Sequence, residues 1–424
     1  MKIILWGINY RPEPTGIAPY NAELAEFLAS RHHDVRVVTG FAYYPHWRKE
    51  RPDRFRFSRA ENIDGVAVFR CWQYVPRRVT TLRRIFHELS FGVSSLVRVL
   101  LLPRADVYVV VSPPLCLGFF AWIASRLKRS CHVFHVQDLQ PGAAVGLGMV
   151  KNRGFIRALA ALERFSYRHA AAVSGISDGM MEEFRRKRVD SRRRVHFPNW
   201  LRRSAPAAER SGRMRERLNV PATNLLAVYS GNLGRKQGID VLLEAAQRLR
   251  DVGAAVTMVI AGAGAEREAL AARIAELRLP ELKLLPLLSD ADYAALLADA
   301  DVGLITQAPG TGRYFFPSKL LTLLQAGLPV VTVADADSEL ARAVADGGFG
   351  INLRPGRPGE LATALQSLGA APHERARLRE RTRWVQRFSP TLVLPTFAHQ
   401  LERIVLESGN PSPAVTAQPE AFRY

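Results

Sequence analysis

Short apolar runs alternate with amphipathic helical runs along nearly the whole chain of 424 residues. Most of these runs are apolar at every position, as is typical of strands whose two faces are both covered. Strands of this kind that alternate with helices predict a parallel sheet with helices on both sides. In the first half of the chain we expect strands within residues 2–8, 35–40, 66–72, 105–112, 131–138 and 171–177.

The same alternation begins again in the second half. A polar, basic stretch without a strand pattern, residues 201–222, separates the two halves. We therefore predict two Rossmann-like, doubly wound α/β domains whose strand carboxyl ends face each other across a ligand crevice. The later strands are expected within 225–232, 255–264, 282–288, 301–308 and 328–334. The predicted divisions are a first domain 1–204, a second domain 205–388, a last helix 389–408 that crosses back to the first domain, and a disordered tail 409–424.

Basic residues exceed acidic ones by 20, and most of this excess lies in residues 1–200. A basic half indicates an anionic partner, which could be nucleic acid, an anionic membrane or a phosphorylated substrate. A GC-rich genome, which favours arginine codons, is the alternative explanation. No recognised nucleic-acid-binding motif is present, so nucleic acid is not an expected partner.

The chain shows no sign of secretion or membrane crossing. Its first residues read as a strand rather than a signal peptide, and no window approaches the roughly 20 apolar residues of a membrane span. The cysteines, Cys71, Cys116 and Cys131, have neither zinc nor disulfide spacing, which fits a reducing cytoplasm.

Three tracts in the first half predict contact with a membrane surface. Residues 46–61 interleave aromatic and basic side chains, 80–103 form a basic amphipathic run, and 113–125 are apolar. Such tracts can lie in the interface of a bilayer. We expect a cytoplasmic protein that is peripheral on the inner face of the cytoplasmic membrane.

Glycine-containing junctions between a strand and a helix supply the candidate binding residues. Glycine lets a ligand approach the backbone, and amides at a helix start favour anions. In the stretch GNLGRKQG (231–238) basic side chains add to a possible diphosphate cradle, although an ordinary basic turn is the alternative. The candidates at these junctions are Thr15 and Gly16 in the first domain, and Gly231, Asn232, Arg235, Lys236, Gly262 and Gly264 in the second.

Two further places carry candidate polar groups. His135 and Asp138 end a predicted strand, where they could orient or deprotonate a hydroxyl, although a structural histidine is equally expected. Asn199 ends the first half, where contact with ligand and a rigid hinge are both open. Ser318 and Lys319 stand where a buried helix begins.

Taken together, the motifs resemble the sugar-nucleotide-dependent glycosyltransferases of family 4, and especially the WcaI group linked to colanic acid and related exopolysaccharides. The resemblance rests on the order of these stretches: NYRPEPTGI, FAYYPHW, PNW, SGNLGRKQG, AGAG, FPSKL, AGLPVV and SELARAVADGGFGINLRPG. It implies the GT-B fold and transfer of a sugar with retention of configuration, without a metal or cofactor. It also implies a nucleotide-sugar donor on the second domain and a polyprenyl-diphosphate-linked saccharide acceptor on the first.

The sequence departs from the family pattern in the donor region. Tyr314 and Thr322 stand where two glutamates are usual, and Asn232 and Gln237 replace an arginine and a lysine. Thr322 could keep one hydroxyl contact to the donor. We therefore assign the leaving phosphate to Lys319 with Lys236 or Arg235, the acceptor side to His135 and Asp138, and donor hydroxyls to Glu339.

The resulting prediction is a retaining hexosyltransferase of exopolysaccharide or surface polysaccharide synthesis, with GDP-fucose or a related deoxysugar as the guessed donor. Two alternatives stay open. One is a glycosyltransferase-like binding or scaffold protein that has lost catalysis, and the other is a GT-B sugar-nucleotide epimerase.

Overall fold

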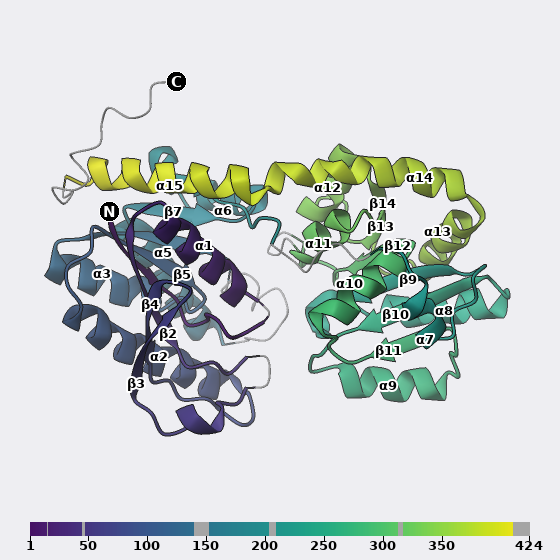
Figure 1. Ribbon diagram of the computed structural model, residues 1–424, viewed down its shortest axis with the longest axis horizontal. Coiled ribbons are helices and arrows are strands. Elements are labelled where there is room, and N and C mark those ends of the chain that lie inside the picture. Colours follow the sequence, from purple (N-terminus) through teal and green to yellow (C-terminus); the bar gives the residue numbers. More distant parts are fainter. Residues whose placement is uncertain (15, 45–46, 140–151, 203–208, 313–316, 410–424) are drawn as a thin grey trace. The chain divides into compact units, whose positions relative to one another are not determined.

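The computed structural model describes residues 1–409 except 15, 45–46, 140–151, 203–208 and 313–316. The chain forms two units (Figure 1). Unit 1 comprises Met1–Asn199 together with the chain from Thr391 onward, and unit 2 comprises Trp200–Pro390. The tail predicted to be disordered lies, from residue 410, outside the described residues.

Unit 1 is built on one sheet of eight strands, in the order β3-β4-β2-β1-β5-β6-β7-β8. All neighbours are parallel except β3 and β4, which pair antiparallel. The strands are β1 (Lys2–Trp6), β2 (Asp34–Gly40), β3 (Ser58–Ile63), β4 (Val66–Cys71), β5 (Val107–Ser112), β6 (Cys131–Val136), β7 (Ala172–Gly175) and β8 (Arg194–His196).

The sequence did not predict the two edge strands, β3 and β8. Strand β3 is polar, and its side chains alternate between exposed and half-buried, because it pairs with a neighbour on one side only. Strand β8 has only three residues. An edge strand does not need two covered faces, so neither shows the continuous apolar run by which the inner strands were found.

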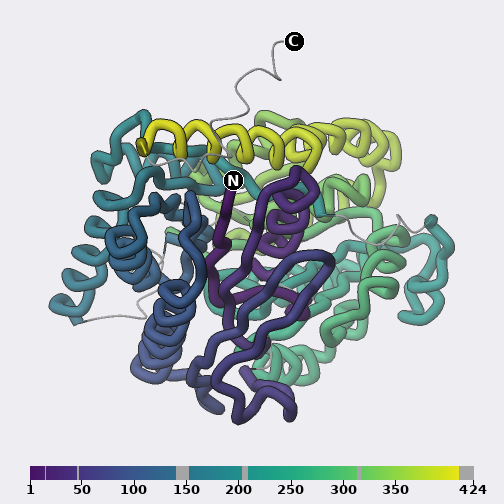
Figure 2. Tube along the Cα trace, turned by 60° about the vertical axis from the view of Figure 1, so that its left-hand side comes forward, coloured from purple at the N-terminus to yellow at the C-terminus, as the bar shows by residue number. Residues whose placement is uncertain are grey.

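Helices cover both faces of this sheet. The chain moves one way along the sheet through α1 (Ala18–Ser30) and the other way through α2 (Thr81–Leu101), α3 (Leu117–Lys128) and α5 (Arg153–His169). Because such crossovers are right-handed, α1 lies on one face and the other three on the opposite face. Helix α3 packs between α2 and α5 (Figure 2). The remaining helical segments are η1 (Arg51–Asp53), α6 (Asp178–Arg186), η2 (Ser191–Arg193) and α15 (Pro390–Glu407).

Helix α15 belongs to unit 1 although it follows unit 2 in the sequence. Phe397 on this helix stacks on Phe197, with ring centroids 3.6 Å apart and planes 5° from parallel. Both rings are buried. The aromatic pair therefore joins the two sequence segments of which unit 1 is made.

Unit 2 has a second, fully parallel sheet in the order β11-β10-β9-β12-β13-β14. The strands are β9 (Leu225–Ser230), β10 (Val256–Ala261), β11 (Leu282–Leu285), β12 (Val302–Thr306), β13 (Val330–Val333) and β14 (Gly350–Leu353). The helical segments are α7 (Arg213–Arg217), η3 (Arg235–Gln237), α8 (Asp240–Asp251), α9 (Arg267–Glu276), α10 (Asp290–Asp299), α11 (Lys319–Gln325), α12 (Glu339–Gly347), α13 (Pro358–Ala370), α14 (Pro372–Arg381) and η4 (Thr382–Phe388).

Two apolar clusters, one on each face, cover the sheet of unit 2. One includes residues of α8 and α13, and the other includes residues of α10, α11 and α12. This double cover explains why the inner strands β9, β10, β12 and β13 are buried at every position, and it confirms the predicted parallel α/β architecture. Among the described residues, no helix is both long enough and apolar enough to cross a bilayer.

A buried carboxylate, Asp299, fastens the start of unit 2. Its side chain is inaccessible to solvent at the end of α10. One carboxylate oxygen accepts hydrogen bonds from the amides of Ser211 and Gly212 at 3.1 and 2.8 Å, and the other accepts from Met214 at 2.7 Å. These amides belong to the first turn of α7 and the residues before it, so Asp299 caps that helix from a distance.

Replacing Asp299 by alanine should destabilise the protein, because three backbone amides lose their buried acceptor at once. We expect a loss on the order of 3 kcal/mol or more in the free energy of unfolding of unit 2, measured by urea denaturation. The control is Asp292→Ala, since Asp292 forms a more exposed ion pair with Arg217 and should cost less than about 1 kcal/mol. Equal losses in the two variants would contradict the assigned role.

Candidate functional site

The order of strands in unit 2 reverses at β9. From β9 the chain moves outward to β10 and β11, and then returns to the other side of β9 to form β12, β13 and β14. In open α/β sheets, ligands bind outside the carboxyl ends of the strands at such a reversal. The loops after β9 and β12 are therefore where topology alone predicts a site, and both contain candidate residues (Figure 1).

The glycines of two neighbouring loops bring these loops into direct contact. A β-carbon on Gly262, after β10, would lie 1.9 Å from the carbonyl oxygen of Gly231, after β9. A β-carbon on Gly264 would lie 2.1 Å from the carbonyl oxygen of Leu233. We expected these glycines to admit a ligand, but the space beside Gly262 and Gly264 is filled by the backbone of the loop after β9.

Lys319 lies against this pair of loops. Its Nζ is 3.9 Å from the centroid of the Tyr229 ring on β9, an arrangement that allows a cation–π interaction. The same Nζ would be 3.2 Å from a β-carbon on Gly231, where the backbone has φ = +133°. A side chain at that position would therefore crowd the lysine, so glycine at 231 keeps the place of the amine open.

The amine of Lys319 is buried without an acceptor among the described residues. Part of its side chain is exposed, but its Nζ is closed off from solvent and donates no hydrogen bond to them. Burial, together with the positive charge of Lys236, lowers the pKa of Lys319 to about 7. An anion at this place would supply the missing partner and favour the charged amine.

The other basic candidates are Arg235 and Lys236, of which Lys236 is close enough for its charge to act on this amine. They belong to a short 3-10 helix, η3, rather than to the start of the expected α-helix, which begins at Asp240. The carbonyl oxygen of Lys236 accepts a hydrogen bond from the amide of Ala308 at 2.9 Å, so η3 is joined to the loop after β12. Arg235 is highly exposed and lies 3.5 Å from Glu266 at the start of α9. Asn232 is also exposed.

The remaining donor-side candidates lie on α11 and α12. Ser318 is exposed just before α11, and Thr322 is half-buried within it. Glu339 is the first residue of α12, after Ser338, whose hydroxyl caps that helix. Tyr314 lies outside the described residues.

In unit 1, His135 is enclosed. Its Nδ1 lies 2.8 Å from the hydroxyl oxygen of Ser174, and its Nε2 lies 2.8 Å from the side-chain nitrogen of Gln137. Burial lowers the pKa of His135 to about 3, so the ring is neutral. Gln137 also exchanges two hydrogen bonds of 3.2 Å with Asn199. The geometry fits the alternative of a structural histidine, which leaves its catalytic role an untested prediction.

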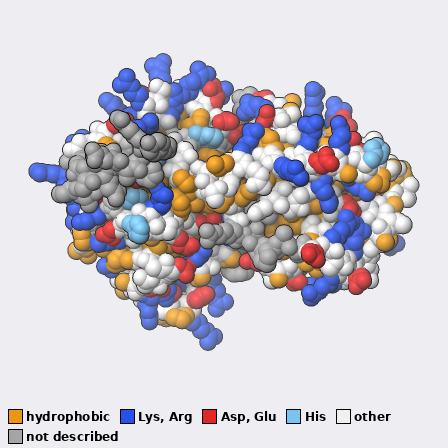
Figure 3. Space-filling view, turned by 45° about the horizontal axis from the view of Figure 1, so that its top comes forward, with side chains coloured by type: hydrophobic (Ala, Val, Ile, Leu, Met, Phe, Trp, Pro, Cys, Tyr) orange, Lys and Arg blue, Asp and Glu red, His pale blue; other side chains and the backbone are white. Residues whose placement is uncertain are grey.

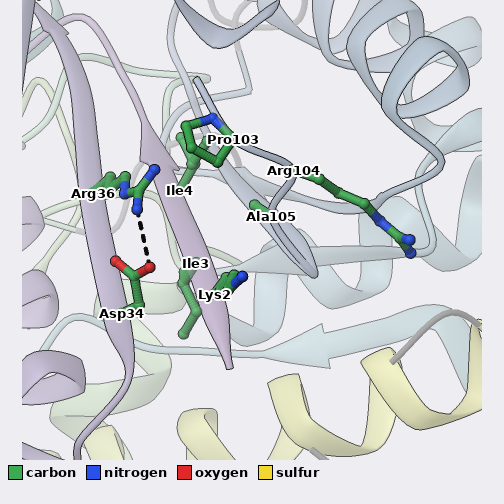
Figure 4. A pocket seen from close by; sticks show the side chains of 8 residues that line it. All are labelled: Lys2, Ile3, Ile4, Asp34, Arg36, Pro103, Arg104 and Ala105. Atoms are coloured by element: carbon green, nitrogen blue, oxygen red, sulfur yellow. Dashed lines mark hydrogen bonds and ion pairs between the residues drawn. The ribbon is translucent and has the colours of Figure 1, made fainter. Parts of the chain in front are cut away.

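The other acceptor-side candidates end strands of the same sheet. Asp138 is half-exposed after β6, and Gly16 is exposed with φ = +71°. Thr15 lies outside the described residues. A cavity at the opposite, amino-terminal end of β1, lined in part by Lys2, holds only about 10 Å³ (Figure 4). That is room for about one water molecule, so this cavity is no candidate for a substrate site.

Sequence reasoning missed two residues of these sites, Tyr229 and Glu13. Tyr229 was counted as one apolar residue of a strand, and its place directly before Ser230 and Gly231 was the only signal. Glu13 is a buried carboxylate in the first loop of unit 1. Its signal was an acidic residue between two prolines, in a loop already thought to matter.

The amine of Lys319 should titrate about three pH units below an ordinary lysine, whose pKa is about 10.4. In NMR spectra of protein with ¹³C-methylated lysines, one signal should have its midpoint near pH 7. This signal should be absent in Lys319→Arg, which assigns it. Inorganic diphosphate should move the midpoint upward, because an anion favours the protonated amine. A midpoint above pH 9 would contradict the burial of the amine.

Comparisons with known proteins show which domain families the two units match. Residues 15–200 match the glycosyl transferase 4-like domain, and residues 211–384 match the glycosyl transferases group 1 domain. The colanic acid biosynthesis glycosyl transferase WcaI of Escherichia coli strain K12 is 35% identical over 351 residues, which cover 81% of this chain and 85% of WcaI.

Solved structures show the same fold at low sequence identity. Sucrose-phosphate synthase of Thermosynechococcus elongatus has a TM-score of 0.76 at 16% identity, covering 96% of this chain and all of that one. HepE of Anabaena in complex with UDP-glucose has a TM-score of 0.66 at 17% identity, covering 95% and 100%. The predicted GT-B class of fold is confirmed, and the similarity to WcaI shows that this chain belongs to the family 4-like glycosyltransferases.

Proposed function

We propose that this protein transfers a sugar from a nucleotide-sugar donor, bound by unit 2, to a polyprenyl-diphosphate-linked saccharide, bound by unit 1. The observation that carries the donor assignment is the buried amine of Lys319, without an acceptor in the described residues, at the reversal of the unit 2 sheet. WcaI, named for colanic acid biosynthesis, supports a role in exopolysaccharide or surface polysaccharide synthesis, and HepE, solved with UDP-glucose, supports the donor class.

The proposed reaction breaks the bond between the anomeric carbon and the diphosphate oxygen and forms a bond from that carbon to an acceptor hydroxyl oxygen. Negative charge develops on the leaving diphosphate, where the ammonium of Lys319, with Lys236 or Arg235 nearby, would stabilise it. The departing phosphate oxygen takes the proton of the acceptor hydroxyl. Attack on the face that the leaving group vacates retains the configuration, and in this scheme the reaction uses no metal and no cofactor.

We propose GDP-fucose or a related deoxysugar donor for the first test, and we propose Ser318, Thr322 and Glu339 as contacts to the nucleoside or sugar hydroxyls. A panel of GDP-, UDP- and dTDP-sugars separates the proposal from its alternatives. A scaffold protein would bind a donor without turnover, and an epimerase would convert a donor with no acceptor present.

Removing the amine of Lys319 should weaken donor binding, because the leaving diphosphate loses its buried cation. We expect Lys319→Ala to lower the affinity for the nucleoside diphosphate at least tenfold by calorimetry at pH 7, and Lys319→Arg to retain more of it. The matched control is Lys283→Ala, a lysine of β11 in the same unit. Wild-type affinity in Lys319→Ala would remove the main support for the donor site.

We also propose that unit 1 binds an anionic membrane through α2. Six apolar side chains on this helix recur every three or four residues and are 43% to 79% exposed: Leu82, Phe86, Leu89, Val93, Val97 and Leu101. This set is called the α2 stripe. A helix with its apolar face in solvent is typical of one that lies in a bilayer interface.

Aromatic and basic residues adjoin the α2 stripe. Phe57 contacts Trp72, whose carbonyl oxygen accepts a hydrogen bond from Ser94 on α2, and both Phe55 and Phe57 are highly exposed. Exposed arginines occupy the segment between β2 and β3, the loop before α2 and the start of α2: Arg51, Arg54, Arg56, Arg77, Arg78, Arg83 and Arg84. Basic side chains are also numerous on the face shown in Figure 3, so the apolar stripe, not charge alone, selects the α2 face.

Binding to vesicles that contain anionic lipid should depend both on the α2 stripe and on the exposed arginines near it. Leu89→Glu with Val93→Glu should weaken binding at least tenfold, because two side chains no longer enter the interface. Arg77→Gln with Arg78→Gln should weaken it about thirtyfold at low salt, at roughly 1 kcal/mol for each arginine, and high salt should reduce this difference. The matched control is Val252→Glu with Leu287→Glu, two exposed apolar residues of unit 2. Equal binding by all variants would exclude the α2 stripe.

A further inference from the structure

Glu13 is a carboxylate almost wholly buried in the loop after β1, with 3% of its surface exposed. Its Oε1 accepts hydrogen bonds from the backbone amides of Tyr43 and Tyr44 at 2.9 and 3.0 Å. Its Oε2 accepts one from the side-chain amide of Asn9 at 2.8 Å. One side chain therefore fastens the loop after β1 to the loop after β2.

Burying a carboxylate costs free energy unless hydrogen bonds or opposite charges compensate for the lost water. Burial raises the pKa of Glu13, while the hydrogen bonds from Tyr43, Tyr44 and Asn9 act in the opposite direction. All three partners donate, so the carboxylate form satisfies each of them without donating anything in return. These bonds offset the cost of burial only while both loops keep their positions.

Tyr44, whose backbone amide donates to Glu13, lies beside the predicted acceptor residue Gly16. A β-carbon on Gly16 would lie 3.8 Å from Cε1 of Tyr44. Burial raises the pKa of the Tyr44 phenol, and the negative charges of Glu13 and Asp138 raise it further, which places both carboxylates within electrostatic range of that ring. Tyr44 thus lies beside Gly16, shortly before α1, and the charge of Asp138 after β6 acts on its phenol.

Other contacts brace the same loops, and Asn9 of the first loop also forms a hydrogen bond with the Tyr43 side chain. Arg70 on β4 donates to the carbonyl oxygens of Arg11 and Gly40. Gln73 binds the backbone of Phe41 in both directions, at 3.0 and 2.6 Å. Within the described residues, Glu13 is the side chain that accepts hydrogen bonds from the backbone amides of Tyr43 and Tyr44.

The topology of unit 1 indicates that the loops joined by Glu13 lie where a ligand would bind. From β1 the chain first moves to β2 and β4, and then returns to form β5 on the other side of β1. The loop that carries Glu13 therefore lies at the strand reversal of this sheet, where ligands bind in doubly wound folds. This is the counterpart in unit 1 of the Lys319 site in unit 2.

We propose that Glu13 is a positioning residue that holds Tyr44 beside Gly16 on the acceptor-binding side of unit 1. This inference rests on the proposed function, because it takes unit 1 to bind the acceptor. Glu13 would touch neither sugar nor acceptor, and would act through the backbone of Tyr43 and Tyr44.

Two variants and one matched control test the inference. Glu13→Ala removes all three hydrogen bonds. Glu13→Gln keeps an oxygen for the two backbone amides, and its new amide group can bond to Asn9 once the Asn9 side chain turns over. Glu163→Ala is the control, because Glu163 is equally buried in unit 1, where it binds Lys187 and Tyr167.

The first readout is amide hydrogen exchange in the full chain. The amides of Tyr43 and Tyr44 should lose at least tenfold in protection in Glu13→Ala and keep it in Glu13→Gln. The amide of Phe41, which bonds to Gln73, should not change in either variant. Unchanged protection of Tyr43 and Tyr44 in Glu13→Ala would overturn the positioning role.

The second readout separates acceptor from donor. With membrane extract as the source of lipid-linked acceptor, Glu13→Ala should raise the acceptor KM at least tenfold and leave donor hydrolysis unchanged. Glu13→Gln should restore the KM, and Glu163→Ala should lower the thermal midpoint without changing the KM. If Glu13→Ala does not fold, Tyr44→Ala replaces it and should raise the KM by a similar factor.

The possible failures are distinguishable. Wild-type protein that hydrolyses a donor but transfers to no lipid-linked acceptor would overturn the proposed function, and the acceptor assignment with it. Wild-type protein that transfers normally, while Glu13→Ala keeps the wild-type KM, would overturn only the inference about Glu13.

Discussion

The backbones of two loops in unit 2 approach each other so closely that no side chain fits between them. The carbonyl oxygen of Gly231 occupies the space where a β-carbon on Gly262 would lie. This contact fixes the path of the chain after β9, and that path in turn sets the space left for the amine of Lys319 above Tyr229. The candidate donor site therefore depends first on the absence of side chains, and only then on its charges.

The architecture was predictable because its physical cause acts along each strand. A central parallel strand such as β5 is buried at all six positions, so the sequence shows a continuous apolar run. Strand β3 is an edge strand whose side chains meet solvent on one side, and it was missed for that reason. Contact between glycine loops joins residues about 30 positions apart, so no local pattern could show which backbone each glycine approaches.

The functional residues were harder to predict than the strands. His135 and Glu13 show why. His135 ends a strand, where functional residues are common, yet its neighbours in space are Ser174, Gln137 and Phe197, and they enclose it. Glu13 has an ordinary local context, and its importance appears only when the chain brings the amides of Tyr43 and Tyr44 to it. Burial of a polar side chain is a property of the folded chain, and neither periodicity nor spacing reports it.

The stacking of Phe397 on Phe197 has a consequence for how the protein is made. Unit 1 is discontinuous, since it needs a helix that the ribosome synthesises after all of unit 2, whereas unit 2 is one uninterrupted segment. Domains generally fold as units during synthesis, with those completed first folding first. Unit 2, the central segment of the chain, can therefore complete its core before unit 1, to which the amino-terminal segment belongs. Until α15 emerges, the ring of Phe197 lacks its partner and unit 1 lacks part of its cover, so a nascent chain exposes apolar surface for as long as translation continues.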